Sequence, residues 1–233
     1  MRRALLAAMV AAIMASATGA ILAKRGPQTQ EITFYIYDRE ARPAKPPAGG
    51  TREGYKVIAK WDSTVTYYYN PQNDDELPAP FVETALAQAT QQWDDNTNFP
   101  LANAPILDDS ASFNSYMNTK NEVCFGNYPT SGVIAVCRMW VTGGKPSSRR
   151  IVEFDLMFDT DYTWGDATTQ TGQIMDLQNI ATHELGHGIA GLDDIYDDAW
   201  VDLTMYGYSD YRETSKRTLE QGDIGGLWAN YGQ

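Results

Sequence analysis

The only two histidines of the chain lie four residues apart, in the segment His183-Glu184-Leu185-Gly186-His187. On a helix, residues four apart share a face, so both imidazoles can point at one metal ion. Glu184 would then lie beside the ion, where a carboxylate can act as general base toward a metal-bound water. This HExxH pattern predicts a zinc site with His183 and His187 as ligands and Glu184 as the catalytic residue.

A tetrahedral catalytic zinc ion needs a third protein ligand and an open position for water. Gly191 can turn the chain back after the helix, so that a residue just past it reaches the ion. This arrangement resembles the extended metzincin motif HExxHxxGxxH/D, in which an aspartate sometimes replaces the third histidine. Because both histidines are already used, an aspartate must serve. Counting from Gly191, the resemblance implies Asp194, which we favour; counting from His187, it implies Asp193 as the alternative.

A methionine further along extends this resemblance. Thr204-Met205-Tyr206-Gly207 is similar to the metzincin Met-turn, in which a methionine, here Met205, lies beneath the zinc-binding imidazoles. Within the metzincins the chain is most similar to the matrixins, the matrix metalloproteinases and their bacterial and archaeal relatives, from about residue 55 to 232. In matrixins a strand at the upper edge of the cleft binds the substrate backbone by strand addition. Ile134 and Ala135 stand at its positions and are the implied substrate-binding residues.

The sequence also departs from the matrixin pattern. Matrix metalloproteinases often hold a second, structural zinc ion with several histidines, and this chain has none to spare, so we expect a single, catalytic zinc ion. Their latency cysteine, in a Pro-Arg-Cys-Gly segment, is missing, so any inhibition by residues 21–54 needs another mechanism. Calcium sites of the family use carboxylates and backbone carbonyls. A structural calcium ion is therefore allowed without a residue assignment, the candidates being Asp155, Asp159, Asp161 and the acidic cluster at 193–202.

The N-terminus predicts export. Arg2 and Arg3 precede an apolar run and then small residues up to Ala20, which is typical of a secretory signal peptide over residues 1–20. The alternative is an uncleaved membrane anchor that reaches Ala23. Cleavage would remove two of the 18 basic residues and leave 16 against 30 acidic ones, a net charge of −14. We therefore expect a secreted, acidic protein that binds no nucleic acid and, after cleavage, has no stable membrane association.

Cys124 and Cys137 are the only cysteines, and they flank a turn-rich segment at residues 126–132. In an exported protein two such cysteines favour a disulfide bond. In the chain-entropy model a loop of this size adds up to about 3 kcal/mol to the stability. The alternative is two independent buried thiols.

The elements that must position these residues alternate between strands and helices. Strands are predicted at 64–69, 133–141 and 151–158, and helices from Pro80, from about Asp176 as N-cap, and from about Leu219 to Tyr231. This mixture predicts an α+β fold, in which the resemblance implies a twisted mixed sheet packed on the zinc-binding helix and a small C-terminal subdomain. Residues 21–54 contain a short apolar segment and a Pro/Gly-rich linker, so the catalytic domain is expected over 55–233.

Together these features predict a secreted zinc endopeptidase that hydrolyses peptide bonds of proteins with a zinc-bound water that Glu184 activates. Its partner would be a protein or peptide substrate, and we expect a monomer. The alternative is a non-catalytic cell-surface binding module with a structural zinc ion, for which a glutamate beside the metal has no use. A third hypothesis is a zinc hydrolase that acts on non-peptide bonds.

Overall fold

The computed structural model describes residues 28–42, 51 and 53–233. The expected signal peptide, residues 1–20, and residues 43–50 of the expected linker lie outside this part of the chain. Among the described residues, no helix combines the length and the apolar character that crossing a membrane requires.

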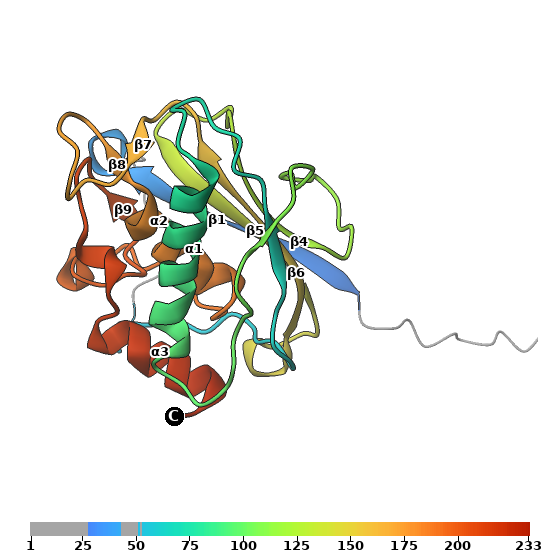
Figure 1. Cartoon of the computed structure of the whole chain (residues 1–233). Helices are drawn as coiled ribbons and strands as arrows, with labels where there is room; N and C mark the ends of the chain where they lie inside the picture. Colours follow the sequence, from blue (N-terminus) through green and yellow to red (C-terminus); the bar gives the residue numbers. More distant parts are fainter. Residues whose placement is uncertain (1–27, 43–50, 52) are drawn as a thin grey trace, which may run out of the picture.

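A mixed sheet of seven strands, in the order β3-β2-β4-β6-β5-β1-β9, forms the centre of the molecule (Figure 1). β5 runs antiparallel to both of its neighbours, β6 and β1, whereas the other pairs are parallel. The prediction of a mixed sheet is therefore confirmed. The strands are β1 (Thr29–Asp38), β2 (Tyr67–Tyr69), β3 (Ile106–Leu107), β4 (Asn121–Gly126), β5 (Val133–Thr142), β6 (Arg150–Asp159) and β9 (Tyr208–Ser209), with β7 (Trp164–Gly165) and β8 (Met175–Asp176) paired separately.

Three α-helices accompany this sheet in the described part of the chain: α1 (Ala79–Asp94), α2 (Leu177–Gly188) and α3 (Gln221–Tyr231). Each begins within two residues of its predicted start. Pro80 lies in the first turn of α1, where its missing N–H costs no hydrogen bond. Asp176 caps α2, because its side chain accepts a hydrogen bond from the N–H of Asn179 at 2.9 Å. α1 packs on α2, which lies against β5 and β6.

α2, the helix that carries the HExxH segment, is buried along almost its whole length. All of its residues except Gln178 are buried. Trp93 of α1 donates its indole N–H to the carbonyl of Thr182 at 2.8 Å. On another side, a Cβ atom at Gly186 would overlap the sulfur of Met205, so only glycine permits this close approach. The helix is thus enclosed by packing rather than exposed on one face.

β1 comes from the segment that the sequence analysis placed before the catalytic domain. It pairs antiparallel with β5, from Thr29 opposite Thr142 to Ile36 opposite Ala135, and in parallel with β9. Phe34 and Ile36 point into the main hydrophobic core and are buried. Residues 29–38 are therefore part of the same sheet as β5 and β6.

The disulfide prediction for Cys124 and Cys137 is wrong, because both thiols are free and buried. Cys124 lies on β4 and Cys137 on β5, and β6 runs between these two strands. Two strand spacings separate the Cα atoms by about 9–10 Å, whereas a disulfide needs less than about 7 Å. The two side chains also belong to different clusters. Cys124 packs with Met157 and Cys137 belongs to the main core.

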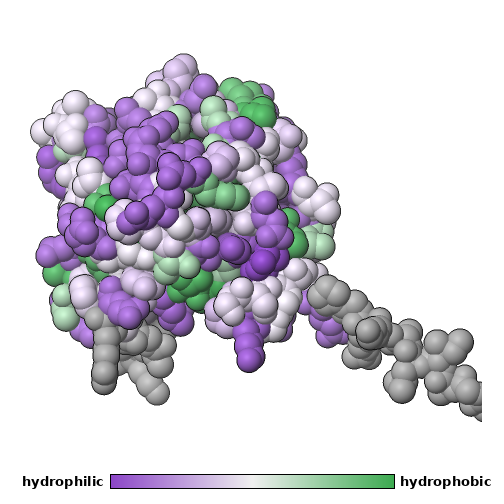
Figure 2. Space-filling model, turned by 90° about the horizontal axis from the view of Figure 1, so that it is seen from below, coloured by the Kyte–Doolittle hydropathy of each residue, from purple (hydrophilic) through white to green (hydrophobic). Residues whose placement is uncertain are grey.

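Large hydrophobic side chains on the surface are scattered. They include Ile106, Leu107, Tyr116, Met117 and Trp228. The face seen in Figure 2 is mostly hydrophilic, with hydrophobic residues in small separate patches. That face therefore shows no broad apolar area of the kind that marks an obligate protein interface.

We expect both thiols to be free in the purified protein. Alkylation in denaturant without reductant should modify Cys124 and Cys137 alike, and prior reduction should leave the alkylated mass and the melting temperature unchanged. Mass spectrometry after proteolysis checks this. A cross-linked peptide that contains both cysteines would contradict the strand order of the sheet.

Candidate metal centre

Three side chains from two neighbouring segments converge on one point. The Nε2 atoms of His183 and His187 lie 3.3 Å apart. Oδ1 of Asp194 lies 3.1 Å from the first and 3.3 Å from the second. Among the described residues, these three form the one group of histidine, cysteine and acidic side chains whose ligand atoms all lie within 4.8 Å of one another. Two imidazole nitrogens and one carboxylate oxygen are a donor set that suits zinc.

Backbone carbonyls fix the orientation of both imidazoles. Nδ1 of His183 lies 2.7 Å from the carbonyl oxygen of Thr204, and Nδ1 of His187 lies 2.8 Å from that of Leu192. A carbonyl can only accept, so the Nδ1–H group donates in each pair and the Nε2 lone pair remains available. Both rings therefore present their metal-binding nitrogen to the same point.

Gly191 makes the turn that brings Asp194 to the histidines. Its φ angle is +72°, in the left-handed region, and a Cβ atom there would overlap the carbonyl oxygen of Ala59. Asp193 points elsewhere and forms an ion pair with Lys56. The structure thus places Asp194, and not Asp193, beside the imidazoles, while its role as a metal ligand stays a prediction.

Glu184 is fully buried, and neither of its carboxylate oxygens has a hydrogen-bond partner among the described residues. Burial raises the pKa of Glu184 to about 8, because the charged form loses its hydration. Burial acts in the same direction on Asp194, but the two imidazoles outweigh it and hold the pKa of Asp194 well below its usual range. The unpaired buried carboxylate of Glu184 is costly, and a divalent cation between Asp194 and the histidines would add positive charge to the site.

Met205 lies against α2 at Gly186, while its expected position beneath the imidazoles stays a prediction. Its turn is fixed by Asp223 of α3. The carboxylate of Asp223 accepts hydrogen bonds from the N–H of Thr204 at 2.9 Å and of Met205 at 3.0 Å. Sequence reasoning missed Asp223, because an acidic residue in the first turn of a helix gives no sign of a distant partner.

Two further aromatic residues at the site were also missed. The ring of Phe34 stacks on the imidazole of His187, with centroids 4.2 Å apart and an interplanar angle of 7°. The hydroxyl of Tyr196 lies 3.0 Å from Oδ2 of Asp194. The only available signal for Tyr196 was its position two residues after the expected ligand, and nothing in the sequence joined Phe34 to a histidine more than 150 residues away.

The remaining predicted positions have protein partners. Asp155 accepts a hydrogen bond from the N–H of Asn114 at 3.1 Å, and Asp159 from the N–H of Asp161 at 3.0 Å. Burial raises the pKa of Asp155 to about 7. A calcium ion at these carboxylates stays a prediction.

Ile134 and Ala135 lie on β5 and are buried. Their contact with substrate stays a prediction too.

Most of the chain is similar in sequence to known proteins. The sequence matches the family model for matrixins over residues 60–232, which include α2, Met205 and Asp223. It is 28% identical to neutrophil collagenase of Homo sapiens over 173 residues, and 28% identical to matrix metalloproteinase-18 of Xenopus laevis over 186 residues. These alignments cover 74% and 77% of this chain but 33% and 35% of the relatives. The chain thus spans about a third of the length of the relatives it matches.

The two adjacent aspartates provide a matched pair of variants. Asp194→Asn should lower the zinc affinity by more than about 100-fold. Substitution of a residue that merely hydrogen-bonds to a metal ligand already lowers metal affinity by about 10–100-fold, and Asp194 is itself the expected ligand. Asp193→Asn should have little effect, since it loses a partly exposed ion pair with Lys56. Zinc content and chelator competition measure both. Zinc lost only from Asp193→Asn would reverse the assignment, and full zinc in both variants would place the third ligand elsewhere.

Glu184 should make the stability of the zinc-free protein depend on pH. Its pKa rises from an ordinary value of 4.5 to about 8 on folding, so the folded state binds the extra proton between these values and loses stability as the pH rises through them. Glu184→Gln should therefore raise the unfolding free energy by on the order of a few kcal/mol at about pH 8.5 and by much less at about pH 5. Urea unfolding of chelator-treated protein measures this. The same gain at both pH values would contradict the burial of an unpaired carboxylate.

Proposed function

The chain belongs to the matrixin family, in agreement with the resemblance seen in the sequence, and on this premise we propose that it is a zinc-dependent endopeptidase. The observation that carries the proposal is the convergence of His183, His187 and Asp194 beside the buried, unpaired carboxylate of Glu184. Three potential ligands leave one position of a tetrahedral ion open. A catalytic site needs that open position, whereas a structural site fills it with a fourth protein ligand.

The residues of the chain divide the work at this site. His183, His187 and Asp194 would hold the zinc ion, which when bound supplies Lewis-acid polarisation of a carbonyl and lowers the pKa of water. Thr204 and Leu192 keep the two imidazoles in the required tautomer through their carbonyl oxygens. The Gly191 turn fixes the anionic ligand.

Glu184 moves the proton. One of its carboxylate oxygens accepts a proton from the attacking water as the new C–O bond forms at the scissile carbonyl carbon. The same carboxyl group then delivers this proton to the amide nitrogen as the C–N bond breaks, and a carboxylic acid and an amine leave.

A binding module with a purely structural zinc ion is the less favoured function. A fully buried carboxylate without a hydrogen-bond partner lowers stability, and such a module would gain nothing from keeping Glu184. A group that is costly for stability and lies beside a metal site is better explained by catalysis.

The wider setting of the enzyme also belongs to this proposal. We propose that the enzyme is secreted, because residues 1–20 have the pattern of a signal peptide. We propose that its substrates are proteins, because it belongs to a family of proteases. The metzincin arrangement is supported by the position of Met205 against α2. The segment after α2, from residue 189 to 233, would be the small C-terminal subdomain of that arrangement.

Glu184→Gln tests the catalytic proposal. This variant should keep its zinc but lose about 10²–10⁴-fold in kcat/KM, the usual contribution of a general base. Asp62→Asn, which changes a carboxylate on the surface, is the matched control and should keep full activity. A fluorogenic peptide library measures hydrolysis with and without chelator and after zinc is restored. Hydrolysis that survives chelation, or a zinc-loaded Glu184→Gln variant with full activity, would overturn the mechanism.

A further inference from the structure

Asp194 differs from the two imidazoles in the number of atoms that it can offer to a metal ion. Each imidazole has its Nδ1 atom beside a backbone carbonyl and presents Nε2 alone. A carboxylate has two equivalent oxygens, and it can bind a metal ion through one of them or through both. The last side-chain torsion of aspartate is broad and roughly two-fold, so the backbone alone does not decide which oxygen faces the imidazoles.

The hydroxyl of Tyr196 distinguishes the two oxygens of Asp194. Oδ1 lies 3.1 Å from Nε2 of His183 and 3.3 Å from Nε2 of His187. Oδ2 lies 3.0 Å from the hydroxyl of Tyr196. Because an ionised carboxylate can only accept hydrogen bonds, the phenol is the donor in this pair. One oxygen of Asp194 thus faces the imidazoles, and the other is held by a hydrogen bond.

Several contacts fix the ring of Tyr196. It meets the ring of Tyr208 in β9 edge to face, with centroids 5.3 Å apart and an interplanar angle of 72°. A Cβ atom at Gly207 would overlap the Tyr196 ring, so only glycine permits this close approach. The N–H of Ile195 donates to the carbonyl of Met205 at 2.9 Å, and the N–H of Gly207 donates to that of Ile195 at 3.0 Å. The phenol therefore extends from a segment that is tied to the Met205 turn.

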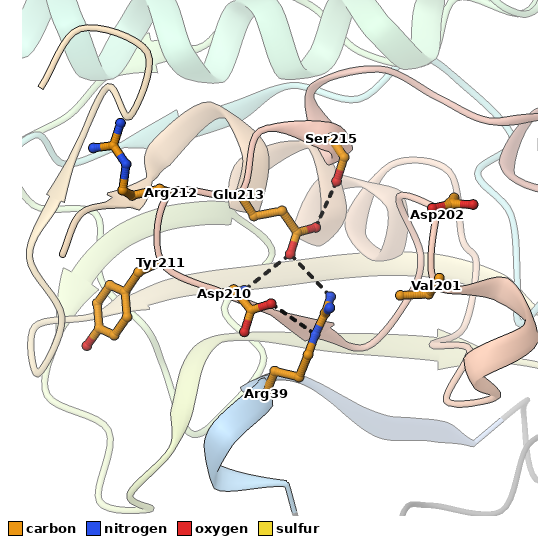
Figure 3. Close-up of a pocket in the computed structure, with 8 residues that line it drawn as sticks. All are labelled: Arg39, Val201, Asp202, Asp210, Tyr211, Arg212, Glu213 and Ser215. Atoms are coloured by element: carbon orange, nitrogen blue, oxygen red, sulfur yellow. Dashed lines mark hydrogen bonds and ion pairs between the residues drawn. The ribbon is translucent and has the colours of Figure 1, made fainter. Parts of the chain in front are cut away.

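A second acceptor of this hydroxyl lies in β1, where the carbonyl oxygen of Tyr35 is 3.2 Å away. Arg39, directly after β1, holds this strand near the segment that follows α2. Its Nε lies 3.1 Å from Oδ2 of Asp210, and its Nη2 lies 3.5 Å from Oε2 of Glu213 (Figure 3). Hydrogen bonds to a charged acceptor are about twice as strong as those between neutral groups. The carboxylate of Asp194 is therefore the preferred acceptor.

We propose that Tyr196 is a positioning residue that lets Asp194 bind the zinc ion through Oδ1 alone. The inference rests on the proposed function. Two imidazole nitrogens and one carboxylate oxygen leave one position of a tetrahedral ion open for water. If Oδ2 were free to bind as well, it would compete with water for this position. The hydroxyl of Tyr196 thus keeps the site open without taking part in the reaction.

The absorption spectrum of the cobalt-loaded protein tests this arrangement, because it depends on the number and geometry of the ligands. The parent chain should show the intense visible bands of four-coordinate Co²⁺. Tyr196→Phe keeps the ring but frees Oδ2, so these bands should lose most of their intensity as the coordination number rises. Tyr208→Phe is the matched control. Its hydroxyl is buried beside the Tyr196 ring without a hydrogen-bond partner among the described residues, so its removal should leave the parent spectrum.

Zinc affinity shows whether Tyr196 acts through Asp194. Tyr196→Phe should lower the affinity by about 10–100-fold, because the carboxylate is no longer held in place before the ion binds. The same substitution in an Asp194→Ala chain should change the affinity by less than about twofold, since the group that it positions is gone. Chelator competition measures all four chains. An equal loss in both backgrounds would indicate a merely structural role and would overturn the inference.

The outcomes separate this inference from the proposed function, because neither the spectrum nor the affinity depends on hydrolysis. Identical cobalt spectra of the parent and Tyr196→Phe would overturn the inference and leave the endopeptidase intact. A zinc-loaded parent that hydrolyses no peptide would contradict the endopeptidase, while the two metal readouts would still decide the role of Tyr196. A parent chain that takes up neither metal would overturn both.

Discussion

The burial of charged groups around α2 is the constraint on which the rest of the structure depends. Glu184 and Asp194 lie out of contact with water, where an uncompensated carboxylate costs several kcal/mol. Several contacts hold the groups around these carboxylates. Backbone carbonyls orient the imidazoles, Asp223 holds the Met205 turn, and Met205 and Trp93 pack closely against α2 at Gly186. These contacts hold two imidazole nitrogens and one carboxylate oxygen close together, in the arrangement that the proposed zinc ion would require.

The parts of the site that could be predicted from the sequence are the local ones. His183, Glu184 and His187 lie within five residues on one helix, so the helical period alone brings them together. The turn at Gly191 is local as well, because its positive φ favours glycine, whereas its close contact with Ala59 depends on a distant segment. The starts of the three α-helices and the strands β5 and β6 were also predicted to within a few residues, since their hydrophobic periodicity is strong, whereas β1 and β4 were not predicted as strands. The presence of Phe34 and Tyr196 at the site could not be predicted, because their contacts depend on how segments far apart in the sequence pack together.

The order of strands in the sheet explains the larger errors. Cys124 and Cys137 are close in sequence, yet β6, which comes later in the chain, inserts between their strands and separates them. In the same way, the short apolar segment of β1 gave no sign that it would pair with β5 a hundred residues further on. The edge of β5 that faces away from β6 is covered by β1, which runs antiparallel to it. An unpaired edge also invites aggregation, so the strand that covers it protects the fold before any catalysis takes place.

The hydroxyl of Tyr196 has one proton but two acceptors, the carboxylate of Asp194 and a carbonyl of β1. It can satisfy only one of them at a time. Whatever changes the demand of Asp194 for that proton must therefore change how tightly the hydroxyl holds the backbone of β1, and a displacement of β1 must act on Asp194 by the same free energy. One hydroxyl group thus couples the candidate metal centre to the N-terminal strand of the sheet.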